Sequence, residues 1–253
     1  MALPISADIL LGGVSRTPFI VTACGYLAMA ILLGAIFRRS VAANPRPSHD
    51  KPKISALPWR ILGQDRAFAF LMASFILWAV VEMQFESNIP LDLSYHFHHG
   101  AKLYGTLGVV DMVIVFGLQL VVSRWLASKT SVWPRYLGFL MLGGLIVGGL
   151  WQTVAGWTIS IILLSVGEVF SLSPIMTLMG ELPRDGQQGS YFALFGMAQG
   201  LATFFAYSLG GFVYHALSPA VLFSLTLPVA VLSALLYRGA DITHRRRTQK
   251  HVA

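Results

Sequence analysis

Three carboxylates stand deep inside long apolar stretches of the sequence, where an ionisable side chain is costly. They are Glu82, Asp111 and Glu168. A charge at the centre of a bilayer costs about 3 kcal/mol or more, so such acids are expected to face a cavity or one another. Two acids in one dry site repel each other and lose hydration, which favours the neutral form and suits a proton carrier. We therefore predict proton or cation binding by these residues, with hydrogen bonds that only fix helix packing as the alternative.

Glu82 and Asp111 are expected at the same depth in a membrane. Glu82 precedes Pro90 by eight residues, and Asp111 follows Leu103 by eight. With a helical rise of about 1.5 Å per residue, both carboxylates lie about 12 Å below the outer boundary of their spans. Because the two spans are consecutive and antiparallel, these acids can meet. Glu168 is expected nearer the midplane, about 16 Å into its span, and for this residue a packing role weighs more.

An aromatic and acidic stripe runs along the span that contains Glu82. Phe75, Trp78, Glu82 and Glu86 recur at intervals of three or four residues and therefore share one helix face. Such a face suits a lipophilic cation, which aromatic rings and carboxylates both attract. We predict that Phe75, Trp78 and Glu86 line a binding cavity around Glu82. An ordinary aromatic packing stripe is the alternative.

Other residues inside the spans are polar or small. Gln119 and Gln199 lie mid-span, where they could form hydrogen bonds inside a cavity or join neighbouring helices. Small residues four positions apart let helices approach closely in lipid, and a proline inside a span predicts a hinge. The residues with these predicted packing and hinge roles are Gly144, Gly148, Pro174, Gly196 and Gly200.

The loop after the acidic stripe carries a cluster of histidines with one aspartate. Asp92, His96 and His99 would align on a helix, as metal ligands could. A fourth ligand is not evident, so a solvated loop with some pH sensitivity is the preferred interpretation. The single cysteine, Cys24, excludes an intrachain disulfide and a multi-cysteine metal site. We predict neither a metal nor a cofactor.

The composition places the elements around these residues in a membrane. Hydrophobic residues make up 55% of the 253-residue chain and charged residues only 11%, whereas a soluble domain carries about 25% charged residues. Mean hydropathy is +0.67. The net charge of +7 is concentrated in polar loops and the C-terminal tail, where anionic lipid headgroups are the nearer partner. It therefore does not indicate nucleic-acid binding.

Hydrophobic runs of roughly 20 residues, long enough to cross about 30 Å of hydrocarbon as helix, occur about seven times. They cover residues 17–37, 66–90, 102–126, 136–154, 157–179, 190–213 and 219–237. We therefore predict an all-α integral membrane protein with about seven transmembrane helices.

The basic residues determine the predicted orientation of these helices. When alternate connections are placed on one side, all 18 Lys and Arg residues except Arg16 and Lys102 fall on that side. Positive loops resist translocation, so this side is cytoplasmic, and so is the C-terminus. The predicted parts are the end of a preceding helix plus one transmembrane helix in 1–37, a basic cytoplasmic linker in 38–65, a six-helix block in 66–238 and a basic cytoplasmic tail in 239–253.

Four stretches of the sequence carry a resemblance to one family. They are QFESNIPL at Gln84–Leu91, the run Gly105–Gln119, Gly167-Glu168 followed by Pro174, and the segment from Arg184 through Gly189-Ser190-Tyr191 to Gly210-Gly211. In this order they are similar to parts of the seventh, eighth, tenth and eleventh helices of a drug-exporter-like transporter of the major facilitator superfamily (MFS). The match in order and spacing extends over about residues 10–238.

The resemblance implies twelve helices in two pseudo-symmetric halves that rock around a midplane cavity. Residues 66–238 would be the C-terminal half of such a transporter. The resemblance names no substrate, and our leading hypothesis is a proton-coupled secondary transporter that exports small amphipathic compounds across the cytoplasmic (inner) membrane. Counterparts of the first four to five helices are absent. We therefore expect a truncated chain or a half-transporter, which needs a separate N-terminal half or self-association. Asp111 stands where such proteins more often have Asn, which could add a titratable site.

Other classes of membrane protein fit the sequence less well. A seven-helix receptor or another non-transporting membrane protein matches the helix count, but the last spans hold no lysine for a retinal Schiff base. An intramembrane enzyme lacks the motif context of an aspartyl protease and any His-x-x-x-His or Ser–His arrangement within the spans. We expect a transporter without enzymatic activity, whose partners are a small-molecule substrate and the lipid bilayer.

Overall fold

The computed structural model describes residues 62–128, 133–183 and 187–252, together with the single positions Leu27, Ile31 and Gly34. The chain divides into two compact units, Met1–Ser55 and Ala56–Ala253, and the fold below is that of the second unit. The predicted span at 17–37, Cys24 within it and most of the predicted linker at 38–65 lie outside the described residues.

Every regular element in the described part of the second unit is an α-helix. The helices are α4 (Arg66–Glu82), α5 (Gln84–His96), α6 (Gly100–Ser128), α7 (Trp133–Leu142), α8 (Leu145–Leu150), α9 (Val154–Glu181), α10 (Gln188–Ala216) and α11 (Pro219–Val252).

Helices in this part of the chain are long and apolar enough to cross a membrane. Five segments meet that condition, and they are Arg66–His96, Gly100–Val122, Val154–Glu181, Gln188–Ala216 and Pro219–Arg247. Tyr136–Leu150 is a shorter apolar segment. These segments coincide with the six apolar runs predicted between residues 66 and 237. The predicted all-α membrane fold class is confirmed.

Two of the predicted spans are interrupted by a turn, and one helix is longer than its span. Met83 separates α4 from α5, although its N–H still bonds the Ala79 carbonyl at 2.8 Å. Gly143 and Gly144 separate α7 from α8. By contrast, α11 continues through the predicted basic tail as far as Val252. The tail is therefore largely a continuation of the last helix.

Side-chain caps start two of the long helices. Asp65 Oδ1 accepts a hydrogen bond from the Phe68 N–H at 3.2 Å before α4. Thr153 Oγ1 accepts from the Gly156 N–H at 3.1 Å before α9. Each oxygen satisfies a backbone donor that has no partner within its own helix. These caps set where α4 and α9 begin.

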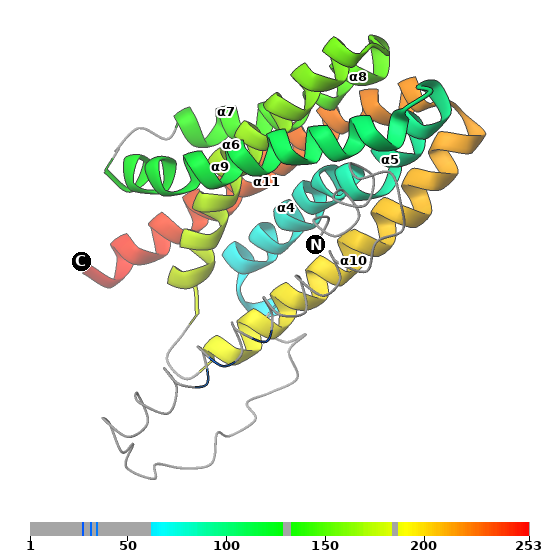
Figure 1. The fold of residues 1–253 in the computed structure, drawn as a ribbon. Coiled ribbons are helices and arrows are strands. Elements are labelled where there is room, and N and C mark those ends of the chain that lie inside the picture. The colour runs from blue at the N-terminus through cyan, green and yellow to red at the C-terminus, as the bar shows by residue number, and fades with distance from the viewer. Residues whose placement is uncertain are drawn as a thin grey trace. The chain divides into compact units, whose positions relative to one another are not determined.

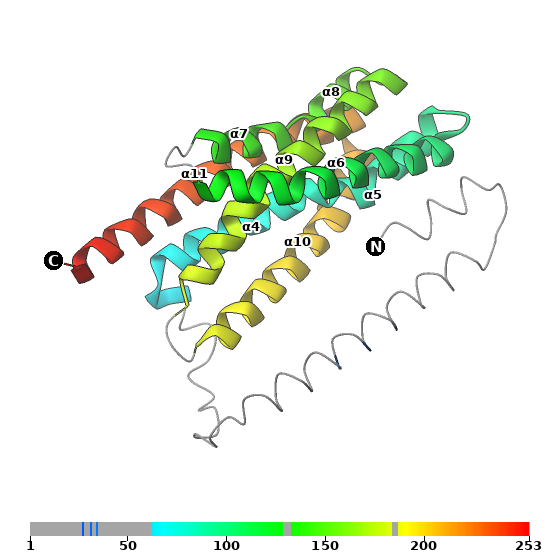
Figure 2. The same ribbon diagram turned by 60° about the vertical axis from the view of Figure 1, so that its left-hand side comes forward.

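Among the described helices of the bundle, α4 has the most neighbours, five, and α9 and α11 follow with four each. α4 packs against α5, α7, α9, α10 and α11, while α9 packs against α4, α6, α7 and α8. α11 runs beside α4, and α10 follows the side of α4 and α5 (Figures 1 and 2). The acids predicted on the 66–90 and 157–179 spans therefore come from two helices with many neighbours, α4 and α9.

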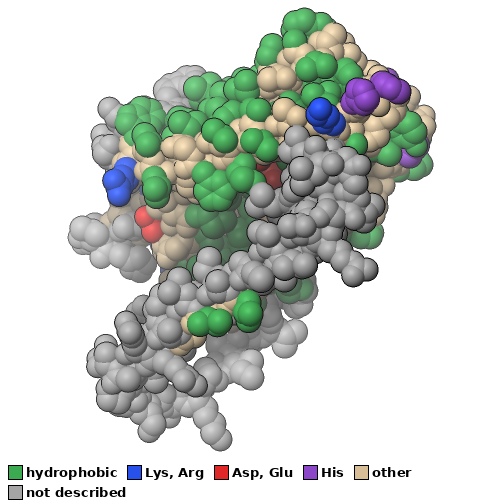
Figure 3. Space-filling view, in the orientation of Figure 1, with side chains coloured by type: hydrophobic (Ala, Val, Ile, Leu, Met, Phe, Trp, Pro, Cys, Tyr) green, Lys and Arg blue, Asp and Glu red, His purple; other side chains and the backbone are tan. Residues whose placement is uncertain are grey.

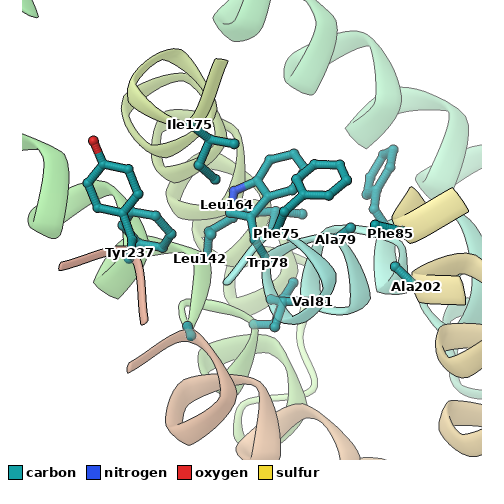
Figure 4. Close-up of a cluster of buried hydrophobic side chains, with 14 of the residues drawn as sticks. Phe75, Trp78, Ala79, Val81, Phe85, Leu142, Leu164, Ile175, Ala202 and Tyr237 are labelled. Atoms are coloured by element: carbon teal, nitrogen blue, oxygen red, sulfur yellow. The ribbon is translucent and has the colours of Figure 1, made fainter. Parts of the chain in front are cut away.

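Aromatic side chains fill much of the space between these helices. Phe75 on α4 stacks on Phe195 of α10 with ring centroids 4.0 Å apart. On the other side, Phe139 of α7 lies 5.4 Å from the ring of Tyr237 of α11. Figure 4 shows Phe75, Trp78 and Tyr237 within this buried cluster. Because lipid is as apolar as these side chains, close contact and not escape from water stabilises the packing.

Buried serines of α9 form hydrogen bonds with neighbouring helices. Ser160 Oγ accepts from the Gly148 N–H at 2.6 Å and lies 2.9 Å from the Gly144 carbonyl oxygen. Near the other end of α9, Ser171 Oγ accepts from the indole N–H of Trp78 at 2.7 Å. Both serines are fully buried, so these bonds form away from lipid and water.

Glycines allow α8 and α9 to approach closely. A Cβ atom on Gly144 would lie 2.5 Å from Leu163 Cβ, and one on Gly148 would lie 2.6 Å from the Trp157 ring. A real Cβ atom does not tolerate such distances, so a larger residue at either position would force the helices apart. The structure thus places both residues at a helix–helix contact.

The other residues with predicted packing and hinge roles lie in different surroundings. Gly196 and Gly200 of α10 have nothing among the described residues within 4 Å of a Cβ position. Pro174 is buried in α9, which stays helical on both sides of it. A packing partner for the two glycines and a hinge at Pro174 stay predictions.

Candidate functional site

The structure brings the three predicted carboxylates together from three helices. Glu82 is the last residue of α4, Asp111 lies in the middle of α6, and Glu168 lies in α9. The Glu82 carboxylate interacts electrostatically with both other acids and with Glu86 of α5, and Asp111 also interacts with Glu168. All four side chains are half-buried. The arrangement is an acidic cluster, defined here as Glu82, Glu86, Asp111 and Glu168.

The turn at Met83 shapes the cluster on the α4–α5 side. It places Glu82 at the end of one helix and Glu86 in the first turn of the next. The Met83 N–H bonds the Ala79 carbonyl at 2.8 Å and the Met83 carbonyl accepts from the Ser87 N–H at 3.0 Å, so the backbone of this turn stays hydrogen-bonded.

Asp111 forms a hydrogen bond that the sequence did not predict. Ser165 Oγ of α9 lies 2.7 Å from Asp111 Oδ1 and 2.7 Å from the backbone carbonyl oxygen of Ile161. Ser165 is fully buried, and it precedes Glu168 by one helical turn. That spacing was the only signal in the sequence that placed Ser165 on the same side of α9 as a predicted acid.

The acidic cluster has no fixed cation in the surrounding helices. The described stretches 67–101, 103–123, 136–183 and 187–237 contain neither Lys nor Arg. The histidines in these stretches, His96, His98, His99 and His215, lie at or beyond the ends of helices α5 and α10. Within the described residues, bound protons or a bound cation are therefore the candidates for balancing the charge of Glu82, Asp111 and Glu168.

Two of the predicted cavity-lining residues are buried in the helix core. Phe75 stacks on Trp78 at 5.7 Å and on Phe195 at 4.0 Å. Trp78 donates its indole N–H to Ser171, and its side chain is 4% exposed. In this structure the aromatic part of the stripe fills the space between α4, α9 and α10. A cavity-lining role for Phe75 and Trp78 stays a prediction.

The two predicted glutamines differ in their exposure. Gln119 lies on the exposed side of α6, and Gln199 is half-buried on α10. The next residue after Gln199 is Gly200, which is also exposed. A cavity-lining role for the two glutamines stays a prediction.

A buried amide pair joins α5 to α10, and sequence reasoning did not assign it a role. Asn88 Nδ2 donates to Gln84 Oε1 at 2.7 Å and to the Ala206 carbonyl at 3.3 Å. A Cβ on Gly210 would lie 2.5 Å from Asn88 Nδ2. The QFESNIPL segment thus places two amides against a glycine of α10. These residues belong to the stretches that carry the family resemblance, which was the available signal.

The prediction of a solvated loop is wrong for Asp92 and His96, which lie in the last turns of α5. Asp92 is fully buried, and its Oδ1 accepts from the Tyr214 hydroxyl at 3.0 Å and lies 3.2 Å from His96 Nδ1. His98 and His99 are exposed, with ring centroids 4.6 Å apart. No group of three or more side chains suited to holding a metal ion occurs in the part of the chain that the structure describes.

The comparison with known families agrees with the resemblance found in the sequence. A family model described as Major Facilitator Superfamily matches residues 1–206. The chain belongs to the major facilitator superfamily. The resemblance inferred from the sequence is therefore confirmed. Proteins of this superfamily are membrane transporters and form a non-enzymatic class, which agrees with the membrane-spanning helices.

A distant relative is another member of the superfamily. The chain is 22% identical over 249 residues to YqjV, an uncharacterised MFS-type transporter of Bacillus subtilis (strain 168). The aligned region covers 93% of this chain and 60% of YqjV. The chain therefore spans about 60% of the length of this curated relative.

The exposed surface of this superfamily member is largely apolar. Hydrophobic side chains cover much of the face in Figure 3, and histidines gather at one end. On α6, Val113 and Phe116 are 66% and 75% exposed, and on α10 Phe204 and Phe212 are 61% and 68% exposed. Such surfaces are stable in contact with lipid or with further helices, and not with water.

The superfamily chain also contains an apolar cavity apart from the acidic cluster. Its volume is about 240 Å³, and it lies between α4, α5, α10 and α11. Val80, Gln84, Phe205, Leu222 and Val229 are among its lining residues. None of the four acids lines it. The lining of this cavity contains no ionisable side chain.

Proposed function

We propose that this MFS protein is a proton-coupled secondary transporter that exports small amphipathic compounds. The observation that carries the proposal is the meeting of Glu82, Asp111 and Glu168 from α4, α6 and α9, without Lys or Arg in the surrounding helices. Acids within membrane spans mark ion and substrate pathways in transporters. Because the three carboxylates share one location, protons and a cationic ligand would compete for them.

Competition of this kind supplies a mechanism for exchange. When the carboxylates bind protons, the cluster is neutral and a cationic substrate is held weakly. When protons leave, the negative cluster attracts a cation, and the aromatic stripe around Phe75 and Trp78 would favour an amphipathic one. Binding of either ligand shifts the population between inward-facing and outward-facing states only if its affinity differs between them. Proton entry would then drive export of the other ligand.

The proposed transport site would be completed by further helices that pack on α6 and α10. The exposed apolar faces of α6 and α10, together with open space at Gly196 and Gly200, suit contact with further helices. A separate N-terminal half or a second copy of the chain would supply them. We place the assembly in the cytoplasmic (inner) membrane with the C-terminus in the cytosol, as the distribution of Lys and Arg favours.

Flux measurements in inverted membrane vesicles test this function. Ethidium serves as the fluorescent amphipathic probe, and an imposed pH gradient supplies the driving force. Glu82→Gln, Asp111→Asn and Glu168→Gln should each abolish pH-driven ethidium uptake, because each removes a titratable group from the cluster. The membrane level of each variant is measured alongside. Unchanged uptake in all three variants would reject proton coupling at this site.

A matched acid outside the cluster provides the control. Glu181 lies at the end of α9, is 56% exposed and contacts His244 at 3.4 Å. Glu181→Gln removes the same charge without touching the acidic cluster, so it should retain uptake. Equal loss in the Glu181 and Glu168 variants would show that charge removal from α9, and not the cluster, causes the defect.

A further inference from the structure

The hydroxyl group of Ser165 contacts two oxygen acceptors at short distance. Its Oγ lies 2.7 Å from Asp111 Oδ1 and 2.7 Å from the backbone carbonyl oxygen of Ile161. Both distances are typical of a full hydrogen bond between oxygen atoms. Because Ser165 is fully buried, water does not compete for these contacts. Whether both contacts are hydrogen bonds therefore depends on how many protons Ser165 Oγ and the Asp111 carboxyl group carry between them.

A count of protons distinguishes the two states of Asp111. A serine hydroxyl has one proton and cannot donate fully to two acceptors. If Asp111 is ionised, it and the Ile161 carbonyl can only accept, and one of the 2.7 Å contacts lacks a proton. If Asp111 carries a proton, it donates to Ser165 Oγ while Ser165 donates to Ile161. Each contact then holds one proton.

We propose that Ser165 is a positioning residue that stabilises the proton-loaded form of Asp111. The inference rests on the proposed proton-binding function of the acidic cluster and adds a residue of α9 to it. On proton release, the Ser165 hydroxyl would turn from the Ile161 carbonyl toward the Asp111 carboxylate. Protonation of Asp111 on α6 would thus decide whether Ser165 donates to the Ile161 carbonyl of α9. Proton binding would in this way be linked to α9, the helix that also holds Glu168.

The groups around Asp111 act in the same direction as this geometry. Glu82 from α4, Glu168 from α9 and Tyr104 from α6 interact electrostatically with Asp111. On the α5 side, Glu86 faces Glu82. None of these groups carries a positive charge, and the described stretches around them lack Lys and Arg. Ser165 is thus the neutral hydrogen-bonding partner among negatively charged or neutral neighbours.

Infrared titration of the full chain in lipid bilayers tests the proposal directly. The carbonyl stretch of protonated Asp111 is assigned as the band that Asp111→Asn removes, and its intensity is followed against pH. Ser165→Ala should move the midpoint of this titration to lower pH by about one unit, a tenfold weaker proton affinity. Ser165→Cys, which keeps a weak donor of similar size, should shift it in the same direction by less.

Two variants complete the measurement. Ser165→Thr retains the hydroxyl and should restore the midpoint of the natural protein. Ser160→Ala removes another buried hydroxyl from α9, one that contacts α8 and not an acid, and should leave the midpoint unchanged. A shift of Ser165→Ala to higher pH would mean that Ser165 serves the ionised carboxylate, which overturns the proposal. An unchanged midpoint, or no titrating Asp111 band, also overturns it.

This readout separates the inference from the proposed function. Ethidium flux that survives Asp111→Asn would remove Asp111 from coupling, whatever the infrared spectra show. The sign of the midpoint shift in Ser165→Ala decides the role of Ser165 without any transport measurement. Each proposal can therefore fail while the other is still tested.

Discussion

Arg247 Nη1 lies 3.1 Å from Asp65 Oδ2, so the last part of α11 is tied to the residue that precedes α4. Tyr191, near the start of α10, donates its hydroxyl to the same carboxylate oxygen at 3.0 Å. The other oxygen of Asp65 caps α4 through the Phe68 N–H. One buried carboxylate thus joins three helices at the end of the bundle that the basic residues assign to the cytoplasm.

Removal of this carboxylate should destabilise the bundle. Asp65→Ala removes the carboxylate that Arg247 and Tyr191 bind and also removes a helix cap, so we expect a loss of about 3 kcal/mol. The midpoint of thermal unfolding in detergent measures it. Asp241→Ala is the control, because Asp241 pairs with Arg245 within α11 and that arginine is 53% exposed. Equal losses in the two variants would contradict a special role for Asp65.

Substitution of a glycine at the α8–α9 contact should cost stability. In Gly148→Ala the new methyl group would lie 2.6 Å from the buried Trp157 ring, and such overpacking costs about 1–3 kcal/mol. Gly196→Ala adds the same methyl group where the described residues leave open space. Its unfolding midpoint should stay the same or rise, since alanine favours helix. Similar midpoints for the two alanine variants would refute the close contact at Gly148.

Trp78 allows packing and ligand binding to be separated. Trp78→Phe keeps an aromatic ring but loses the hydrogen bond to Ser171, so a stability loss of about 1 kcal/mol is expected. Trp78→Ala should lose about 3–5 kcal/mol, because it leaves a cavity in the core. If Trp78 only packs, the phenylalanine variant should transport ethidium with unchanged apparent affinity. Weaker apparent affinity at nearly full stability would instead support the predicted lining role.

The orientation of the helices can be tested by labelling single cysteines. In a Cys24→Ser background, His98→Cys and Arg246→Cys introduce thiols at exposed positions near opposite ends of the bundle. A membrane-impermeant maleimide added to intact cells should label only the cysteine at position 98. Permeabilised cells should label both. Labelling of position 246 in intact cells would reverse the predicted topology.

The membrane fold could be predicted because its signal is long and simple. Each span between residues 66 and 237 is an apolar run of helical length, and the structure has a helical segment at every one of them. The turns at Met83 and Gly143-Gly144 were not foreseen, because apolar composition is the same on both sides of them. The helical continuation of α11 to Val252 was missed for a different reason. Its charges indicated only a cytoplasmic location.

The candidate site was only partly readable from the sequence. Depth along ideal helices placed Glu82 and Asp111 at one level, and the structure brings them into electrostatic range. The roles of these acids stay predictions. Ser165 was not found, since a serine in a helix usually bonds its own backbone and its partner on another helix depends on how the helices rotate. The same dependence hid the Asp65–Arg247 pair.

The serines of α9 restrict which motions this helix can make. Ser160, Ser165 and Ser171 bond α8, α6 and α4 at three heights along one axis. Axial rotation of α9 would strain all three bonds at once, and a buried hydroxyl that loses its partner costs about 1–3 kcal/mol. If the proposed transport site alternates in access, α4, α6, α8 and α9 would therefore move together as a rigid body. Helices would then slide against each other where α10 contacts α4, α5 and α11.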